Sequence, residues 1–207
     1  MIKAIIFDFG SVLVGDEWRA IYKEIAQKLK IPEEKVKESS KPLLRKWSIG
    51  EIDEEKFWQE FEKQVGKKLA PEFTKDLWFR TYRDLTKNIN GTWEILQELK
   101  TRGVRLAILS NTIPPHVRAH KKTGRVNKLK NLGFKIFVRS CEVGFRKPNP
   151  KIYQLTLKKL NLPSETCVFI DDKLVNIEVA KELGLREIHF QTPERLRKDL
   201  VKLGLLQ

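Results

Sequence analysis

Short, almost wholly apolar runs that alternate with amphipathic helical patterns are the feature that most constrains the fold of this 207-residue chain. Runs of this kind that end at polar residues are typical of strands buried on both faces of a sheet. Strands that alternate with helices form parallel βαβ units. The expected strands are Lys3–Phe7, Val104–Leu109, Ile136–Val138, Cys167–Ile170 and Ile188–Phe190, and the expected helices among them are Trp93–Lys100, Pro150–Leu160, Val175–Leu183 and Glu194–Leu203.

Residues 17–88 interrupt this alternation, because they contain amphipathic segments and no convincing strand. We therefore expect an α/β core with a parallel sheet, built from residues 1–16 and 89–207, and an all-helical insertion after the first strand, residues 17–88. The tryptophans of the insertion are expected to pack its interior rather than to stack on a ligand. Its expected helices are Trp18–Leu29, Glu33–Trp47, Glu54–Val65 and Pro71–Leu85, and its tryptophans are Trp18, Trp47, Trp58 and Trp78.

Composition excludes several classes of protein. With 41% hydrophobic and 33% charged residues, the chain is not wholly disordered. No apolar run approaches the roughly 18 residues that a membrane-spanning helix needs. Two cysteines, Cys141 and Cys167, do not make a disulfide framework. These observations predict a reduced, cytoplasmic protein without a membrane partner.

The formal net charge of +14 arises mostly from one stretch, since no acid occurs between Glu98 and Glu142. Such an excess suits an anionic partner, either a phosphorylated small molecule or a nucleic acid, but a lysine-rich solvated surface explains it equally well. The basic residues of the stretch are Lys100, Arg102, Arg105, Arg118, Lys121, Lys122, Arg125, Lys128, Lys130, Lys135 and Arg139.

Polar residues follow the expected strands in an order that suggests one shared site. In a parallel sheet, ligands bind at the carboxyl ends of the strands. Each polar residue alone could be a turn former or a helix cap. Together they form four segments, namely Asp8-Phe9-Gly10-Ser11, Ser110-Asn111-Thr112, Lys147-Pro148 and Asp171-Asp172, with Asn176 after the last.

These four segments, in this order, resemble the motifs of the haloacid dehalogenase-like hydrolase superfamily, and the resemblance covers nearly the whole chain. The stretches 50–58 and 142–153 are similar to the branch that contains sugar-phosphate phosphatases and the phosphatase domain of epoxide hydrolases. The resemblance implies a Rossmann-like three-layer core with a parallel sheet, and a helical cap at residues 17–88. It also implies a Mg²⁺-dependent phosphatase that hydrolyses a small phosphomonoester, such as a sugar phosphate, through an aspartyl-phosphate intermediate.

The chemistry expected of these residues follows the needs of phosphoryl transfer. A carboxylate can attack phosphorus if positive charge screens the anionic phosphate, and oxygen ligands suit Mg²⁺. By resemblance, the catalytic residues are Asp8 as nucleophile, Ser110 and Lys147; the substrate-binding residues are Ser11, Asn111 and Asn176; and the Mg²⁺ site comprises Asp8, the Gly10 carbonyl and Asp172, with Asp171 holding a metal-bound water.

One position departs from the motif of most phosphatases in the superfamily. They carry a second aspartate two residues after the nucleophile, as general acid and base, and this chain has Gly10 there. Loss of a general acid and base lowers the rate of catalysis about 10²- to 10⁴-fold. We therefore expect slow or selective turnover.

Alternatives to a phosphatase stay open. A 2-haloacid dehalogenase uses the same aspartate without metal, although the Asp171-Asp172 pair favours a metal-dependent enzyme. A weakly active relative could use the basic stretch to bind RNA or an acidic protein; nucleic acid is possible but not favoured. His116 and His120 have a metal-ligand spacing, but we expect them to face solvent because their neighbours are all positive. The sequence does not predict the oligomeric state.

Overall fold

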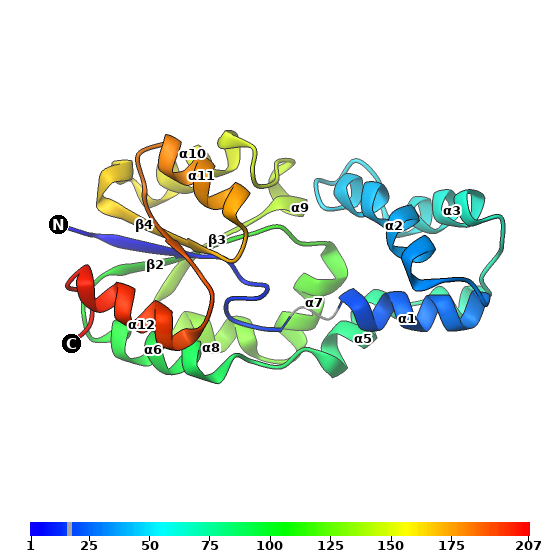
Figure 1. Ribbon diagram of the computed structural model, residues 1–207, viewed down its shortest axis with the longest axis horizontal. Helices are drawn as coiled ribbons and strands as arrows, with labels where there is room; N and C mark the ends of the chain where they lie inside the picture. Colours follow the sequence, from blue (N-terminus) through cyan, green and yellow to red (C-terminus); the bar gives the residue numbers. More distant parts are fainter. Residues whose placement is uncertain (16–17) are drawn as a thin grey trace.

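The computed structural model describes residues 1–15 and 18–207, and it contains a five-stranded parallel sheet in the order β3-β2-β1-β4-β5 (Figure 1). This confirms the expected α/β class. The first strand in the chain lies at the centre, so the polar residues that follow it are flanked by those that follow β2 and β4. The strands are β1 (Ala4–Phe7), β2 (Arg105–Ser110), β3 (Phe134–Arg139), β4 (Cys167–Asp171) and β5 (Arg186–His189).

Alternate residues of the buried strands belong to two apolar clusters, one on each face of the sheet. In β1, Ile5 and Phe7 pack with leucines of α6, α8 and α12, while Ala4 and Ile6 pack with residues of α10 and α11. The result is three layers, as the sequence predicted. The helices are α6 (Asn90–Lys100), α8 (Arg125–Asn131), α10 (Pro150–Leu160), α11 (Leu174–Glu182) and α12 (Pro193–Lys202), with the short α9 (Ser140–Val143) and a 3-10 turn, Ser164–Thr166.

The chain between Trp18 and Leu85, here called the helical segment 18–85, consists of five helices and their connecting turns, and it has an apolar cluster of its own. Figure 1 shows its helices extending away from the sheet. The segment expected as one helix, Pro71–Leu85, is broken at Asp76, whose φ of 54° is left-handed and interrupts helical geometry. The boundary expected between residues 16 and 17 falls outside the described residues. The helices are α1 (Trp18–Leu29), α2 (Glu33–Trp47), α3 (Glu54–Val65), α4 (Pro71–Thr74) and α5 (Leu77–Leu85).

A helix that the sequence pattern did not predict, α7 (Pro114–Lys122), follows β2 and packs against α5. It begins with two prolines, which are well placed in the first turn of a helix. Its buried face consists of Val117, Ala119 and two histidines, so apolar periodicity is weak. Helix α7 links the sheet to the helical segment 18–85.

Part of the basic stretch is used inside the molecule. The guanidinium of Arg125 is largely buried and donates to the side chain of Asn88. Arg118 pairs with Asp76 of the helical segment. The exposed remainder of the stretch includes Lys121, Lys122, Lys128, Lys130 and Lys135. None of the helices described is both long and apolar enough to cross a membrane.

Candidate active site

The polar ends of the three adjacent strands β2, β1 and β4 meet at one edge of the sheet. The register pairs Phe7 with Ile108 on one side and with Ile170 on the other, so Asp8 comes level with the end of β4. The backbone N–H of Asp8 donates to the carbonyl of Ile170 at 2.8 Å and extends this alignment by one residue. Asp8 is buried, and its Oδ1 accepts a hydrogen bond from the N–H of Phe9 at 2.7 Å. Its carboxylate is therefore held rigidly at the strand edge.

The ammonium of Lys147 joins the ends of all three strands. Its Nζ lies 2.8 Å from Oδ1 of Asp8 and 2.6 Å from Oδ2 of Asp171, and it donates to the carbonyl of Leu109 at 2.8 Å. The Lys147 side chain is 1% exposed. Asn111 exchanges two hydrogen bonds with the Lys147 backbone, at 2.8 and 2.9 Å. The expected substrate-binding amide of Asn111 is thus engaged in holding the lysine.

Asp171 is completely buried and fully bonded. Besides Lys147, its carboxylate accepts from Nδ2 of Asn176 at 2.9 and 3.0 Å and from the N–H of Lys173 at 2.9 Å. The backbone carbonyl of Asn176 accepts a hydrogen bond from the hydroxyl of Tyr153. The side chain of Asn176, expected to bind substrate, therefore donates to Asp171.

Burial and charge set the protonation of this group. Burial raises the pKa of Asp8 to about 6, although the Lys147 ammonium lowers it in part. Burial disfavours the Lys147 ammonium, but Asp8 and Asp171 together outweigh this and raise the pKa of Lys147 above its ordinary value. At neutral pH the lysine is charged and Asp8 is mostly ionised.

Three carboxylates at the sheet edge have the composition of a site for a hard cation. One oxygen from each of Asp8, Asp171 and Asp172 lies within 4.8 Å of the others. Oδ1 of Asp172 is buried and has no hydrogen-bond partner among the described residues. An unpaired buried carboxylate oxygen is costly, and a divalent cation such as Mg²⁺ prefers oxygen ligands of this type. The residues therefore fit a bound Mg²⁺.

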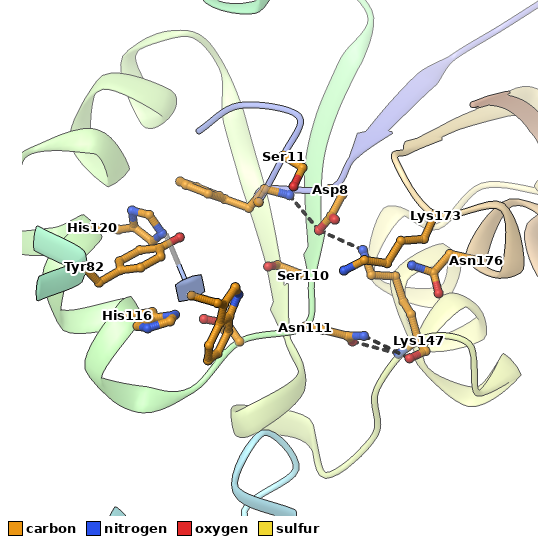
Figure 2. A pocket seen from close by; sticks show the side chains of 14 residues that line it. Asp8, Ser11, Tyr82, Ser110, Asn111, His116, His120, Lys147, Lys173 and Asn176 are labelled. Carbon is orange, nitrogen blue, oxygen red and sulfur yellow. Dashed lines mark hydrogen bonds and ion pairs between the residues drawn. The ribbon is translucent and has the colours of Figure 1, made fainter. Parts of the chain in front are cut away.

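A cavity of about 50 Å³ opens beside Asp8 (Figure 2). Asp171 and Asp172 lie beside Asp8 rather than in the cavity lining. The residues with an expected role that line it are Asp8, Gly10, Ser11, Ser110, Asn111, Lys147 and Asn176. The lining residues to which the sequence assigned no role are Phe9, Trp18, Tyr82, Thr112, His116, His120 and Lys173.

Two of the additional residues could have been found from the sequence. Lys173 directly follows the aspartate pair, and Thr112 directly follows Ser110-Asn111. Trp18 had been expected in the interior of the helical segment; it packs against that cluster but also lines the cavity. Trp47, Trp58 and Trp78 are buried in the cluster as expected.

The expectation that His116 and His120 face solvent was wrong. The two side chains are buried, and the residues are only 3% and 7% exposed. Their four-residue spacing puts both on one face of α7, and Tyr82 of α5 covers that face. The ring of Tyr82 stacks on the ring of His116, with 3.7 Å between the ring centroids. The ring centroids of His120 and Phe9 lie 4.1 Å apart. The positively charged neighbours Arg118, Lys121 and Lys122 are exposed on the other faces of the helix.

Burial also fixes the charge of the histidine pair. It lowers the pKa of His116 well below the ordinary value, and the nearby His120 adds to the effect. Burial, with Arg125 and Arg139, lowers the pKa of His120 to about 3. Both imidazoles are therefore neutral at physiological pH.

A parallel sheet with a lysine-bridged carboxylate cluster at its edge defines a class of α/β hydrolytic enzyme, and comparison with known families agrees. The family model of the haloacid dehalogenase-like hydrolases matches residues 2–184. The chain belongs to this family and is a hydrolase.

Phosphatases are among its relatives. It is 28% identical over 206 residues to the D-ribitol-5-phosphate phosphatase of Bacteroides thetaiotaomicron, covering 97% of both chains. It is 31% identical over 110 residues to the phosphorylated carbohydrates phosphatase of Thermotoga maritima, which is 53% of this chain and 49% of that protein. The mouse acyl-CoA dehydrogenase family member 10 is 29% identical, but the chain spans only 19% of its length.

Solved structures share the fold. A HAD family enzyme from Bacteroides thetaiotaomicron, in complex with magnesium and inorganic phosphate, superposes with a TM-score of 0.73 at 22% identity, over 93% of this chain and 96% of that one. The L-2-haloacid dehalogenase of Xanthobacter autotrophicus gives a TM-score of 0.65 at 18% identity, over 100% and 85% of the chains. The likeness therefore extends to both phosphate-bound and dehalogenase structures.

Proposed function

We propose that the protein is a Mg²⁺-dependent phosphatase that hydrolyses a small phosphomonoester through an aspartyl-phosphate at Asp8. The observation that carries the proposal is the position of Lys147, whose ammonium contacts Asp8 and Asp171 within the cluster of three carboxylates. A cation bound between carboxylates is what an anionic nucleophile needs in order to approach an anionic phosphate. The phosphatase relatives support the same reaction class.

In the proposed reaction, a carboxylate oxygen of Asp8 attacks phosphorus as the bond from phosphorus to the leaving oxygen breaks. Lys147 neutralises charge on Asp8 and on the phosphoryl group, and Ser110 and Ser11 donate hydrogen bonds to phosphoryl oxygens. Water then cleaves the acyl-phosphate and regenerates Asp8. Asp8, the Gly10 carbonyl and Asp172, with Asp171 beside them, would hold Mg²⁺, which would supply further positive charge to the phosphoryl oxygens.

The helical segment 18–85 acts in this proposal as a cap over the site. Trp18 of α1 and Tyr82 of α5 line the cavity from this segment, while Asp8 and Lys147 belong to the sheet. A cap that supplies part of the cavity wall excludes water from the phosphoryl group and selects the substrate. The residues 1–15 and 89–207 then form the catalytic core.

The glycine at position 10 limits the rate in this account. Asp8 is the only carboxylate in the described lining of the cavity, so none of the described lining residues is a second carboxylic acid that could protonate the leaving oxygen. Turnover should therefore be slow, or selective for leaving groups that need little protonation.

The test is release of p-nitrophenol from p-nitrophenyl phosphate with Mg²⁺, before and after chelation by EDTA. We expect hydrolysis that EDTA abolishes and added Mg²⁺ restores. Release of halide from a 2-haloacid that survives EDTA would instead assign the dehalogenase reaction. Asp172→Asn should raise the Mg²⁺ concentration needed for half-maximal rate, because it removes charge from the oxygen that has no protein partner.

A further inference from the structure

His116 and His120 form part of the cavity wall, yet the proposed reaction does not use them. Figure 2 shows them with Tyr82 on the side of the cavity opposite Lys147 and Asn176. They come from α7, which follows the strand that ends at Ser110. In an in-line attack by Asp8, the leaving group points away from the Asp8 oxygen into the cavity that this wall bounds.

Each imidazole has a nitrogen without a partner. Nε2 of His116 and Nδ1 of His120 are buried, and neither has a hydrogen bond to any described residue. Leaving a polar group unpaired in the interior costs about 1–3 kcal/mol, so such atoms in a native structure call for a function. The χ2 torsion of histidine is soft, and a modest ring rotation can bring such a nitrogen to a ligand in the cavity.

The chemistry of this wall suits an uncharged, hydroxyl-bearing ligand. A neutral imidazole offers one donor and one acceptor, which match the O–H and the lone pairs of a hydroxyl group. The rings of Trp18 and Tyr82 give apolar faces for C–H groups. Among the described lining residues, the lysines are Lys147 and Lys173, and both lie on the opposite side. The described residues of this wall therefore offer no cation in the cavity lining to a leaving group that carries its own carboxylate or phosphate.

We propose that His116 and His120, with Tyr82 stacked on the first, form the leaving-group subsite and select phosphomonoesters whose leaving group is small, uncharged and rich in hydroxyls. The proposal rests on the phosphatase function proposed above and adds the specificity determinants to it. The two histidines are specificity residues and carry no proton in the reaction.

The first experiment compares two substrates that differ by one group. Glycerol 3-phosphate and 3-phosphoglycerate share their carbon chain, but a carboxylate in the second replaces a CH₂OH in the first. With Mg²⁺, the wild-type protein should show a kcat/KM for glycerol 3-phosphate at least about 10-fold higher. An equal or higher value for 3-phosphoglycerate would overturn the assignment of a neutral subsite.

The second experiment removes the unpaired nitrogens. His116→Leu and His120→Leu should each lower the ratio of kcat/KM for glycerol 3-phosphate to kcat/KM for p-nitrophenyl phosphate about 10-fold or more, because the second substrate has no alcohol hydroxyl for the imidazole to bind. His116→Gln and His120→Asn place an amide nitrogen near the lost Nε2 and Nδ1, so each should recover much of the rate. If a leucine variant fails to fold, the same comparison of substrates is made with the corresponding Gln or Asn variant.

The outcomes separate the two proposals. An equal loss on both substrates, or no loss on either, in folded variants would refute the subsite while leaving the phosphatase intact. If the wild-type protein with Mg²⁺ hydrolyses p-nitrophenyl phosphate, the proposed function stands whatever the histidine variants do. If it hydrolyses none of the three esters, the proposed function fails and the subsite fails with it.

Discussion

The ammonium nitrogen of Lys147 lies 2.8 Å from Oδ1 of Asp8, and both side chains are buried at the edge of the sheet. The same nitrogen contacts Asp171, so one cation balances two buried carboxylates, and it opposes the burial that raises the pKa of Asp8. The proposed nucleophile therefore depends on Lys147 for its ionisation as well as for its approach to phosphate. Activity and stability are coupled through this pair.

Replacing the nucleophile should separate these two properties. Asp8→Asn keeps the size of the side chain and removes its nucleophilic oxygen, so turnover should fall by about 10³-fold or more. The fold should persist, because burial disfavours the charge that is removed. Steady-state rates and thermal unfolding measure the two effects. Glu165→Gln, which neutralises an exposed acid, is the matched control. Full activity in the Asp8→Asn variant would rule out Asp8 as nucleophile.

Removing the bridging cation should instead destabilise the protein. Lys147→Met leaves Asp8 and Asp171 buried without their cation, at a cost of about 3–5 kcal/mol in the free energy of unfolding at pH 7.5. Loss of the ammonium also raises the pKa of Asp8 further above about 6. The deficit relative to wild type should therefore shrink at pH 5, where Asp8 takes up a proton in the folded variant.

Urea unfolding without divalent cation at the two pH values measures this deficit. Lys158→Met, at an exposed position of α10, should cost little at either pH. A deficit that is the same at pH 7.5 and pH 5 would mean that the loss comes from packing rather than from unpaired charge.

Restoring an acid two residues after the nucleophile should speed turnover. A Cβ on Gly10 meets no atom within 4 Å, and Gly10 lines the cavity, so Gly10→Asp fits without displacing a neighbour. We expect the rate of p-nitrophenyl phosphate hydrolysis to change little, because its leaving group needs little protonation, and that of an alkyl phosphate to rise about 10-fold or more. Gly10→Asn, of the same size, should give no gain. An unchanged or lower rate on the alkyl ester would contradict the missing-acid account.

The strand-edge residues could be predicted because their positions follow from topology. Asp8, Ser110 and Asp171 each stand at or just after the end of an apolar run, and parallel strands bring such ends together. Lys147 lies outside any strand, so topology does not fix its position, and only the family resemblance assigned it a catalytic role. Its two carboxylate contacts could not be read from its sequence neighbours.

The wall formed by α7 could not be predicted, because its histidines are buried by a partner that lies far away in the sequence. Nothing near His116 indicates Tyr82, which precedes it by more than thirty residues and stacks on its ring. The sequence has positive residues between and directly after the two histidines, and these neighbours predicted that the histidines face solvent. The packing of α5 on α7 overrides that local signal. For the same reason, the sequence did not predict the partners of Asn111 and Asn176. Their side-chain amides form hydrogen bonds with the Lys147 backbone and with the Asp171 carboxylate, which are distant in the sequence or lie on another element.

The buried histidines should make the protein acid-labile. Both have folded-state pKa values below the ordinary 6.5, about 3 for His120, because burial disfavours the imidazolium. Below pH 6.5 the unfolded chain therefore binds protons that the folded protein does not. The stability tied to each histidine is complete above pH 6.5 and is lost as the pH falls toward the folded pKa, at about 1.4 kcal/mol per pH unit.

Chemical denaturation between pH 8 and pH 4.5 should show this dependence. Below pH 6, the slope of unfolding free energy against pH should be smaller by about 1.4 kcal/mol per unit in His120→Asn than in wild type, because asparagine takes up no proton. Above pH 7 the two slopes should coincide, whatever the offset that the substitution itself causes. Parallel curves over the whole range would show that His120 is protonated alike in the folded and unfolded states, and a charged His120 would be incompatible with a neutral leaving-group wall.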